Sequence, residues 1–364
     1  MILKEITNYL EEYAPLSSQE SYDNCGLIVG NKNTEINSAL IALDCTEEII
    51  EEAILKKCNL VIVHHPIIFS GLKKLNGNNY IERTVIKAIE NKIAIYAIHT
   101  NLDNQLNGVN FEIGSRLKLK NLSILSPKQN TLLKLTVNIP STHSEKLLEK
   151  LFETGVGKIG NYKNCSFKQE GVGSFQPTNN AQPFIGEKNV TEFVKEDKIE
   201  VLIQNHQVSL VLETIKTHHP YEEVAYELIP LKNTNNYEGS GMVGYLEKEM
   251  NEVDFLQLIK ETFDCKIIRH TKLLNKPIKK IAFCGGSGSF LLEKAKNSNA
   301  DIFITGDYKY HDFFDAEDEI IIADIGHFES EQYTSNLLVD ILTKKFPTFA
   351  FEITGIKTNP INYF

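Results

Sequence analysis

Short apolar runs that alternate with amphipathic segments constrain the fold of this chain more than any other feature. Six runs in the first and last thirds have the length of buried strands: 39–43, 60–64, 93–98, 279–284, 301–305 and 319–324. Apolar side chains at helical spacing predict helices over 2–14, 46–57, 80–91, 108–118, 253–263, 290–297 and 329–345. Parallel strands need a long crossover connection, usually a helix, so this order predicts α/β architecture with parallel sheets.

The pattern changes after Pro127, where strands and helices follow a different order. We expect strands over 132–139, 199–204 and 224–229, one or two short strands within 165–175, and helices over 144–153 and 208–217. The order β-α-β-β-α-β is typical of a ferredoxin-like α+β module of about 100 residues. Loop-like segments flank it, so we expect residues 129–234 to be an inserted domain. Residues 1–128 and 235–364 would then form one interrupted α/β domain.

Composition narrows the class of protein. The 364 residues allow two or three domains. A net charge of −10 without a basic stripe argues against non-specific binding to nucleic acid. The N-terminus lacks the pattern of a signal peptide, and no apolar run reaches the roughly 18 residues of a membrane span. Six cysteines without CxxC spacing indicate buried thiols, and a reducing cytoplasm is the expected location.

Two adjacent histidines end the apolar run at 60–64. His64 and His65 are followed by Pro66. In a regular strand, adjacent side chains point to opposite faces, so the pair serves one site only if the strand has ended or if each histidine binds a different ion. Pro66 favours the first condition, because proline cannot donate to the strand ladder.

Three more polar clusters stand at predicted strand ends. They are His99 with Asp103, Asp307 with His311, and His327 with Glu331. Ligands of parallel α/β sheets bind beyond the carboxyl ends of the strands. His327 and Glu331 are four residues apart, so a helix that begins there places both on one face.

Histidine and carboxylate ligands favour Zn²⁺, Mn²⁺ or Fe²⁺ over Ca²⁺ or Mg²⁺. The clusters offer more ligands than the three that a single catalytic zinc takes from protein, and a carboxylate shared between two ions would account for the excess. Spacing alone leaves packed core histidines as the alternative. His99 is open as a ligand, a base or a packed residue, and Asp103 is the better metal candidate of that pair.

Three other motifs have simpler interpretations. The second His-His-Pro triplet, at 218–220, follows a helix and has no clustered partners, which indicates a helix terminus and a turn. Residues 285–289 are glycine-rich but lack the lysine of a phosphate-binding loop, so we expect a tight turn. Asp23 and Asn24 lie in a polar loop and serve either loop chemistry or a turn.

Taken together, the motifs resemble the NIF-three-like family, whose members are often labelled GTP cyclohydrolase 1 type 2 homologues. The resemblance covers nearly the whole chain and is carried by Asp23–Leu27, His64–Phe69, His99–Asp103, Thr305–Asp307 with Tyr310-His311, and Gly326-His327 with Ser330-Glu331. Tyr22 stands where many members have tryptophan. The middle segment is similar to the inserted domain of long bacterial members, which is related to PII and CutA proteins.

The resemblance implies a site for two divalent metal ions per subunit, Zn, Mn or Fe. Its ligands would be His64, His65, Asp103, His327 and Glu331, with Glu331 as the bridge. The resemblance also implies a toroidal homo-oligomer, commonly a hexamer.

The expected function is hydrolysis of a nucleotide or related small molecule by a metal-activated water. His99 or His311 would move protons, with His99 as the preferred catalytic residue. The GTP cyclohydrolase label by itself does not establish that activity. The alternative is a non-enzymatic metal or metabolite sensor, in which the inserted module regulates access to the site.

Overall fold

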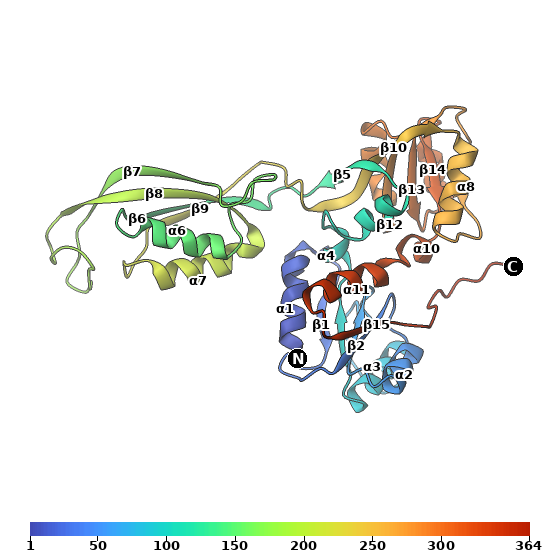
Figure 1. The fold of residues 1–364 in the computed structure, drawn as a ribbon, viewed down its shortest axis with the longest axis horizontal. Helices are drawn as coiled ribbons and strands as arrows, with labels where there is room; N and C mark the ends of the chain where they lie inside the picture. Colours follow the sequence, from blue (N-terminus) through green and yellow to red (C-terminus); the bar gives the residue numbers. More distant parts are fainter. The chain divides into compact units, whose positions relative to one another are not determined.

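The computed structural model describes residues 1–364 and divides them into two compact units (Figure 1). The first unit comprises Met1–Pro127 together with Asn236–Phe364, and the second comprises Lys128–Asn235. That each part is an independent domain with its own role stays a prediction.

One sheet of the first unit has the strand order β1-β4-β3-β2-β15. Its strands are β1 (Gly26–Val29), β2 (Ser38–Ala42), β3 (Leu60–Val63), β4 (Ala94–Ala97) and β15 (Ala350–Ile353). The four strands from β4 to β15 are parallel, and β1 pairs antiparallel with β4. The last strand of the chain therefore completes a sheet that the N-terminal segment begins.

The other sheet of the first unit has the order β11-β14-β13-β12-β10-β5. Its strands are β5 (Lys120–Pro127), β10 (Gly239–Met250), β11 (Arg269–His270), β12 (Ile278–Ser287), β13 (Ile302–Gly306) and β14 (Ile321–Asp324). Only β12, β13 and β14 are parallel, and β5, β10 and β11 join antiparallel. The fold is thus mixed α/β with several sheets, and the strands β5 and β11 were not expected from the sequence.

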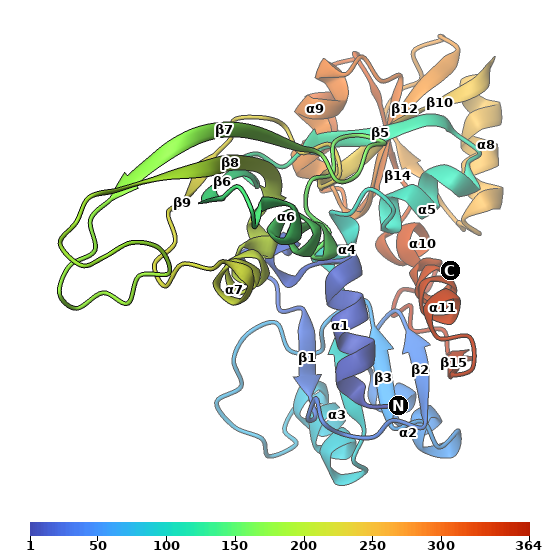
Figure 2. The ribbon, with the colours of Figure 1, turned by 60° about the vertical axis from the view of Figure 1, so that its left-hand side comes forward.

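Helices cover both faces of the first sheet because the strands are apolar on both sides. The helices of this unit are α1 (Leu3–Tyr13), α2 (Glu47–Leu55), α3 (Tyr80–Glu90), α4 (Thr100–Asp103), α5 (Val109–Arg116), α8 (Glu252–Thr262), α9 (Leu292–Asn297), α10 (His327–Glu331) and α11 (Thr334–Lys345). Helices α1 and α11 pack into the core on one face of the first sheet, and α2 and α3 pack on the other (Figure 2). The helices leave the ends of the strands uncovered, and polar side chains lie there.

Two expectations about the C-terminal third are wrong. The helix expected over 329–345 is two helices, α10 and α11, separated at Gln332 and Tyr333. Tertiary hydrogen bonds stabilise this break between the helices. Gln332 donates to the carbonyl of Phe263 at 2.8 Å, and the Tyr333 hydroxyl donates to the carbonyl of Thr262 at 3.0 Å. A periodic apolar pattern does not report such tertiary hydrogen bonds.

The tight turn expected at 285–289 is also wrong. Strand β12 continues to Ser287, and its register with β13 is irregular between Phe283 and Ser287. Gly286 absorbs this irregularity with a φ of 61°, a value that glycine adopts without strain. The glycines therefore form a bulged strand end.

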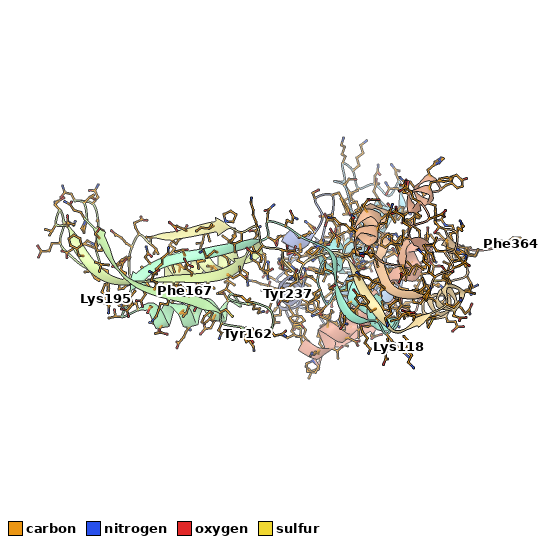
Figure 3. The ribbon with its side chains drawn as sticks, turned by 90° about the horizontal axis from the view of Figure 1, so that it is seen from above. Lys118, Tyr162, Phe167, Lys195, Tyr237 and Phe364 are labelled. Carbon is orange, nitrogen blue, oxygen red and sulfur yellow. The ribbon has the colours of Figure 1, made fainter.

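The second unit is a four-stranded antiparallel sheet in the order β7-β8-β6-β9. Its elements are β6 (Leu132–Pro140), α6 (Ser144–Glu153), β7 (Ser166–Phe175), β8 (Glu192–Gln204), α7 (Val208–His218) and β9 (Tyr226–Pro230). Figure 3 marks Phe167 on β7 and Lys195 on β8, the two long strands. Helices α6 and α7 cover one face of the sheet. The chain order and strand order are those of a ferredoxin-like module, whereas the relation to PII and CutA proteins stays a prediction.

No helix anywhere in the structure combines the length and the apolar character that crossing a bilayer requires.

Candidate metal centre

The centre lies where strand ends of the first unit meet helix α10. Strand β3 ends at Val63, so His64 and His65 leave the ladder and both turn toward one site. The one-turn helix α4 supplies Asp103, and α10 supplies His327 and Glu331 from its first and last residues. All five predicted ligands come together, although they are up to 267 positions apart in the sequence.

His64 is fully buried, and its two ring nitrogens have different roles. Its Nδ1 lies 2.8 Å from the carbonyl oxygen of Ile98, so Nδ1 carries the proton and donates. The lone pair of Nε2 then faces Asp103 Oδ1 at 3.5 Å and Glu331 Oε1 at 3.9 Å. Both His64 Nε2 and Asp103 Oδ1 are buried without a hydrogen-bond partner. A bound cation satisfies two such acceptors, and burying them without one is costly.

His65 and His327 repeat this arrangement. His65 Nδ1 donates to Asp44 Oδ1 at 2.7 Å, and His327 Nδ1 donates to Asp307 Oδ2 at 2.6 Å. Both Nε2 atoms lie 3.0 Å from Glu331 Oε2 and 3.2 Å from each other. Histidines that bind metal usually donate their other nitrogen to a carboxylate or carbonyl, which fixes the ring and the tautomer. All three imidazoles meet that description.

The ligand atoms form two triads that share Glu331. One triad is His65, His327 and Glu331, and the other is His64, Asp103 and Glu331. Within each triad the ligand atoms lie within 4.8 Å of one another. Oε2 of Glu331 faces the first triad and Oε1 faces the second. A carboxylate with this placement can bridge two ions, so the donor set fits a dinuclear site of nitrogen and oxygen ligands.

Glycines at the end of β12 make room for this carboxylate. A Cβ atom at Gly286 would lie 2.4 Å from Glu331 Oε1, and one at Gly285 would lie 3.3 Å from Glu331 Cγ. The Gly286 amide also donates to the hydroxyl of Ser330 at 2.9 Å, which fixes the end of α10. The sequence showed a glycine cluster after a strand but gave no sign of its partner.

His99 lies beside the centre and is oriented by Asp23. Asp23 Oδ1 accepts from His99 Nδ1 at 2.9 Å, and the carboxylate also accepts from the amide of Thr100 at 3.0 Å. The side chain of Asp23 is 0% exposed. The ring of His99 lies 5.1 Å from that of His64 and 5.2 Å from that of His65, and these three histidines form a further group of neighbouring ligand atoms. Asp23 also accepts from the amide of Asn24 at 2.7 Å, so its carboxylate holds both its own loop and the ring of His99.

Proximity of these charges shifts their pKa values. Burial opposes charge on His65, but hydrogen bonds to Asp44 and Glu331 outweigh it and raise the pKa to about 9. Burial is outweighed at His327 by the charge of Glu331, and the pKa rises to about 11. Burial and repulsion from Glu331 raise the pKa of Asp103 to about 7. Burial alone would raise the pKa of Glu331, yet His327 holds it well below its usual range. Protons on Nε2 of His65 and His327 would therefore compete with a metal ion.

A cleft of about 890 Å³ adjoins the centre. His65, His99 and His327 line one side of it. The rest of the lining includes Phe69 and Tyr80, the lysines Lys73 and Lys74, and Thr358 from the C-terminal segment. Thr358 donates its hydroxyl to Asp44, the carboxylate that orients His65. The cleft offers aromatic and basic side chains next to the cluster.

Some expectations about the site need correction. His311 is exposed and stacks against Phe314, and it is not among the clustered residues. Asp307 bonds with His327, so the expected pairing of Asp307 with His311 is wrong. The sequence analysis also assigned no role to Asp44. Its position could have indicated one, because Asp44, like Asp307, follows closely on the end of a parallel strand.

The second His-His-Pro triplet has no free ligand atom at its buried histidine. His219 Nε2 donates to the carbonyl of Asn138 at 2.9 Å, and its Nδ1 accepts from the amide of Tyr221 at 3.0 Å. One nitrogen therefore bonds to strand β6 and the other to the turn after α7.

Comparisons with known proteins give one consistent relationship. A Staphylococcus aureus (strain MSSA476) protein named GTP cyclohydrolase 1 type 2 homolog is 37% identical over 368 residues, with 100% of both chains covered. A Staphylococcus epidermidis (strain ATCC 35984) protein of the same name is 34% identical over 371 residues, again with 100% coverage of both. A crystal structure of a Bacillus cereus protein related to NIF3 has 34% identity and a TM-score of 0.87, covering 100% of this chain and 99% of that one. The family described as Duf34/NIF3 (NGG1p interacting factor 3) matches residues 1–360, and this chain therefore belongs to that family.

Proposed function

We propose that the five clustered residues bind two divalent metal ions and that the protein is a metal-dependent hydrolase of a nucleotide or related small molecule. The ions would be Zn²⁺, Mn²⁺ or Fe²⁺, because the donors are imidazole nitrogens and carboxylate oxygens. One ion would be held by His65 and His327 and the other by His64 and Asp103, with Glu331 between them.

A single observation carries the proposal: three imidazoles have Nδ1 occupied by an acceptor and Nε2 turned toward one carboxylate. His219, a structural histidine, has both ring nitrogens on backbone groups, whereas the clustered Nε2 atoms face carboxylate oxygens and one another. Here His64 Nε2 and Asp103 Oδ1 are buried and unpaired. The family name is a homology label, so the proposed activity depends on this geometry.

The residues around the centre support hydrolysis. When bound, the two ions would supply Lewis-acid activation of water and of the electrophile. Asp23 fixes the tautomer of His99, so His99 Nε2 is available to accept a proton and return it to the leaving group. Lys73 and Lys74 would attract a phosphate, and Phe69 and Tyr80, both more than half exposed, would contact a base.

The test is hydrolysis of a nucleotide panel by the protein loaded with Mn²⁺ or Zn²⁺. We expect turnover that Glu331→Ala and His65→Ala abolish, whereas His219→Ala retains it. Turnover unchanged in Glu331→Ala would contradict the proposal. Stoichiometric metal binding without turnover of any compound would instead support the sensor alternative.

The assembly implied by the family resemblance is part of the proposal. We expect the chains to form a toroidal hexamer, so light scattering after size exclusion should give six times the 41.2 kDa of one chain. A monomeric mass at micromolar concentration would contradict it.

A further inference from the structure

We propose that the second unit binds a small organic cation, a primary amine or a guanidinium on a short carbon chain, in a cavity of about 400 Å³. The volume lies within the range of small-molecule sites. Every lining residue belongs to the segment 128–235, so the proposal does not depend on the metal centre. Neither the family name nor the predicted hydrolase activity assigns a ligand to this cavity.

The cavity lies on the face of the sheet that the helices leave uncovered. Along β8 the buried residues Ile199 and Val201 pack with α6 and α7. Glu196 lines the cavity and has the opposite parity, so its side chain points to the other face. The β7–β8 connection, 176–191, covers part of the cavity and is closed by a hydrogen bond of 2.7 Å from the Asn189 amide to the Pro177 carbonyl.

Three aromatic rings form the walls. Tyr221 lies 5.7 Å from Phe175 and 6.5 Å from Phe184, measured between ring centroids. The plane of Tyr221 is inclined by 64° to that of Phe175 and by 53° to that of Phe184. The rings are therefore not stacked in parallel, and space remains between them. Aromatic faces carry a negative quadrupole that attracts ammonium and guanidinium groups. These walls thus favour a cation over a neutral polar ligand.

The charged residues of the lining are all acidic. They are Glu196, Glu222 and Glu223, and the lining has no lysine, arginine or histidine. The Tyr221 hydroxyl donates to Glu196 Oε1 at 2.8 Å, and the Gln182 amide donates to Glu222 Oε1 at 2.7 Å. None of the three carboxylates forms an ion pair. An acidic cavity without counter-charge concentrates cations from solution.

A glycine shapes the floor. A Cβ atom at Gly173 would lie 2.3 Å from Glu196 Oε2 and 2.6 Å from Glu196 Cδ. Glu196 therefore crosses β7 only because position 173 has no side chain. Its two oxygens are placed between Tyr221 and the strand, where they can accept hydrogen bonds from an N–H donor beside the aromatic rings.

Isothermal titration of the full chain with butane-1,4-diamine and with agmatine tests the proposal, with butane-1,4-diol as an uncharged probe of the same length. We expect saturable binding of at least one cation, and none of the diol. Glu196→Gln should weaken binding about tenfold or more, because it removes the charge from one hydrogen-bonded partner. Phe184→Ala should weaken it less, because Phe184 is partly exposed.

The matched control is Glu170→Gln on the same strand as Gly173. Glu170 does not line the cavity, and its ion pair with Lys195 is exposed on both sides. It should leave the affinity within twofold, and circular dichroism checks that each variant is folded. Equal binding of the diol, unchanged binding in Glu196→Gln, or absence of binding below about 10 mM of either cation would overturn the proposal.

Discussion

The chain contains two His-His-Pro triplets, and their surroundings differ. His64-His65-Pro66 ends a parallel strand, and each ring donates through Nδ1 to a carbonyl or a carboxylate. The triplet at 218–220 ends a helix, and the buried His219 uses both nitrogens on the backbone of its own unit.

The two buried histidines differ in their second ring nitrogen. At both triplets one nitrogen donates to a carbonyl or carboxylate, which fixes the ring. At His219 the other nitrogen, Nδ1, accepts a hydrogen bond from the amide of Tyr221 in the adjacent turn. At His64 the other nitrogen, Nε2, has no hydrogen-bond partner and faces carboxylate oxygens. Four predictions test this contrast, in order of decreasing effect.

Glu331→Gln should have the largest effect. Both triads lose the shared carboxylate, so we expect loss of both ions and a drop in affinity larger than the ~10–100-fold typical of residues outside the first coordination shell. Metal analysis after dialysis measures it. Glu329→Gln is the matched control, because Glu329 is also buried on α10 but belongs to neither triad. Full metal content in Glu331→Gln would remove the basis for the two-ion site.

Lower pH should weaken metal binding. The pKa of His65 is raised to about 9, so this group is protonated at neutral pH and must lose its proton to bind an ion. His327, with a pKa of about 11, must lose its proton as well. Affinity should therefore rise with pH up to about 11, by about tenfold per unit for each proton released, and most steeply below about 9, where both histidines are protonated. Titration calorimetry in buffers of different ionisation enthalpy counts the protons. Release of no proton at pH 7 would contradict the pKa shift.

Asp44→Asn should lower the affinity for the ion bound by His65 about 10–100-fold. The amide no longer stabilises the Nδ1–H tautomer as a carboxylate does, and the hydrogen bond from Thr358 is weakened too. The ion held by His64 and Asp103 should be affected less. Stepwise metal titration separates the two sites, and a uniform loss at both would argue against separate triads.

His219→Ala should leave metal binding unchanged. It leaves the Asn138 carbonyl and the Tyr221 amide without their partner, so the second unit should lose about 1–3 kcal/mol of unfolding free energy. Urea unfolding with metal analysis of the same sample measures both quantities. Reduced metal content at full stability would erase the contrast between the triplets.

Much of the local structure was predictable, because it depends on short-range patterns. The helix over 144–153 is observed as Ser144–Glu153, and the strand over 60–64 as Leu60–Val63. The helix expected over 46–57 is observed as Glu47–Leu55, and Thr46 caps it because its hydroxyl accepts a hydrogen bond from the amide of Ile49. Strand β5 was missed, because it is a partly exposed strand that gains its hydrogen bonds from β10, more than 100 residues later.

The sequence alone placed His64, His99 and Asp307 close to strand ends, because an apolar run ends just before each of them. It also determined that His327 and Glu331 share a helix face, since i and i+4 positions always do. Only the tertiary structure decided that Glu331 turns one oxygen to each triad. That placement requires a glycine bulge in β12, a break between α10 and α11, and carboxylates at 44 and 307 that orient the rings. These contacts join residues far apart in the chain, and no local pattern encodes them.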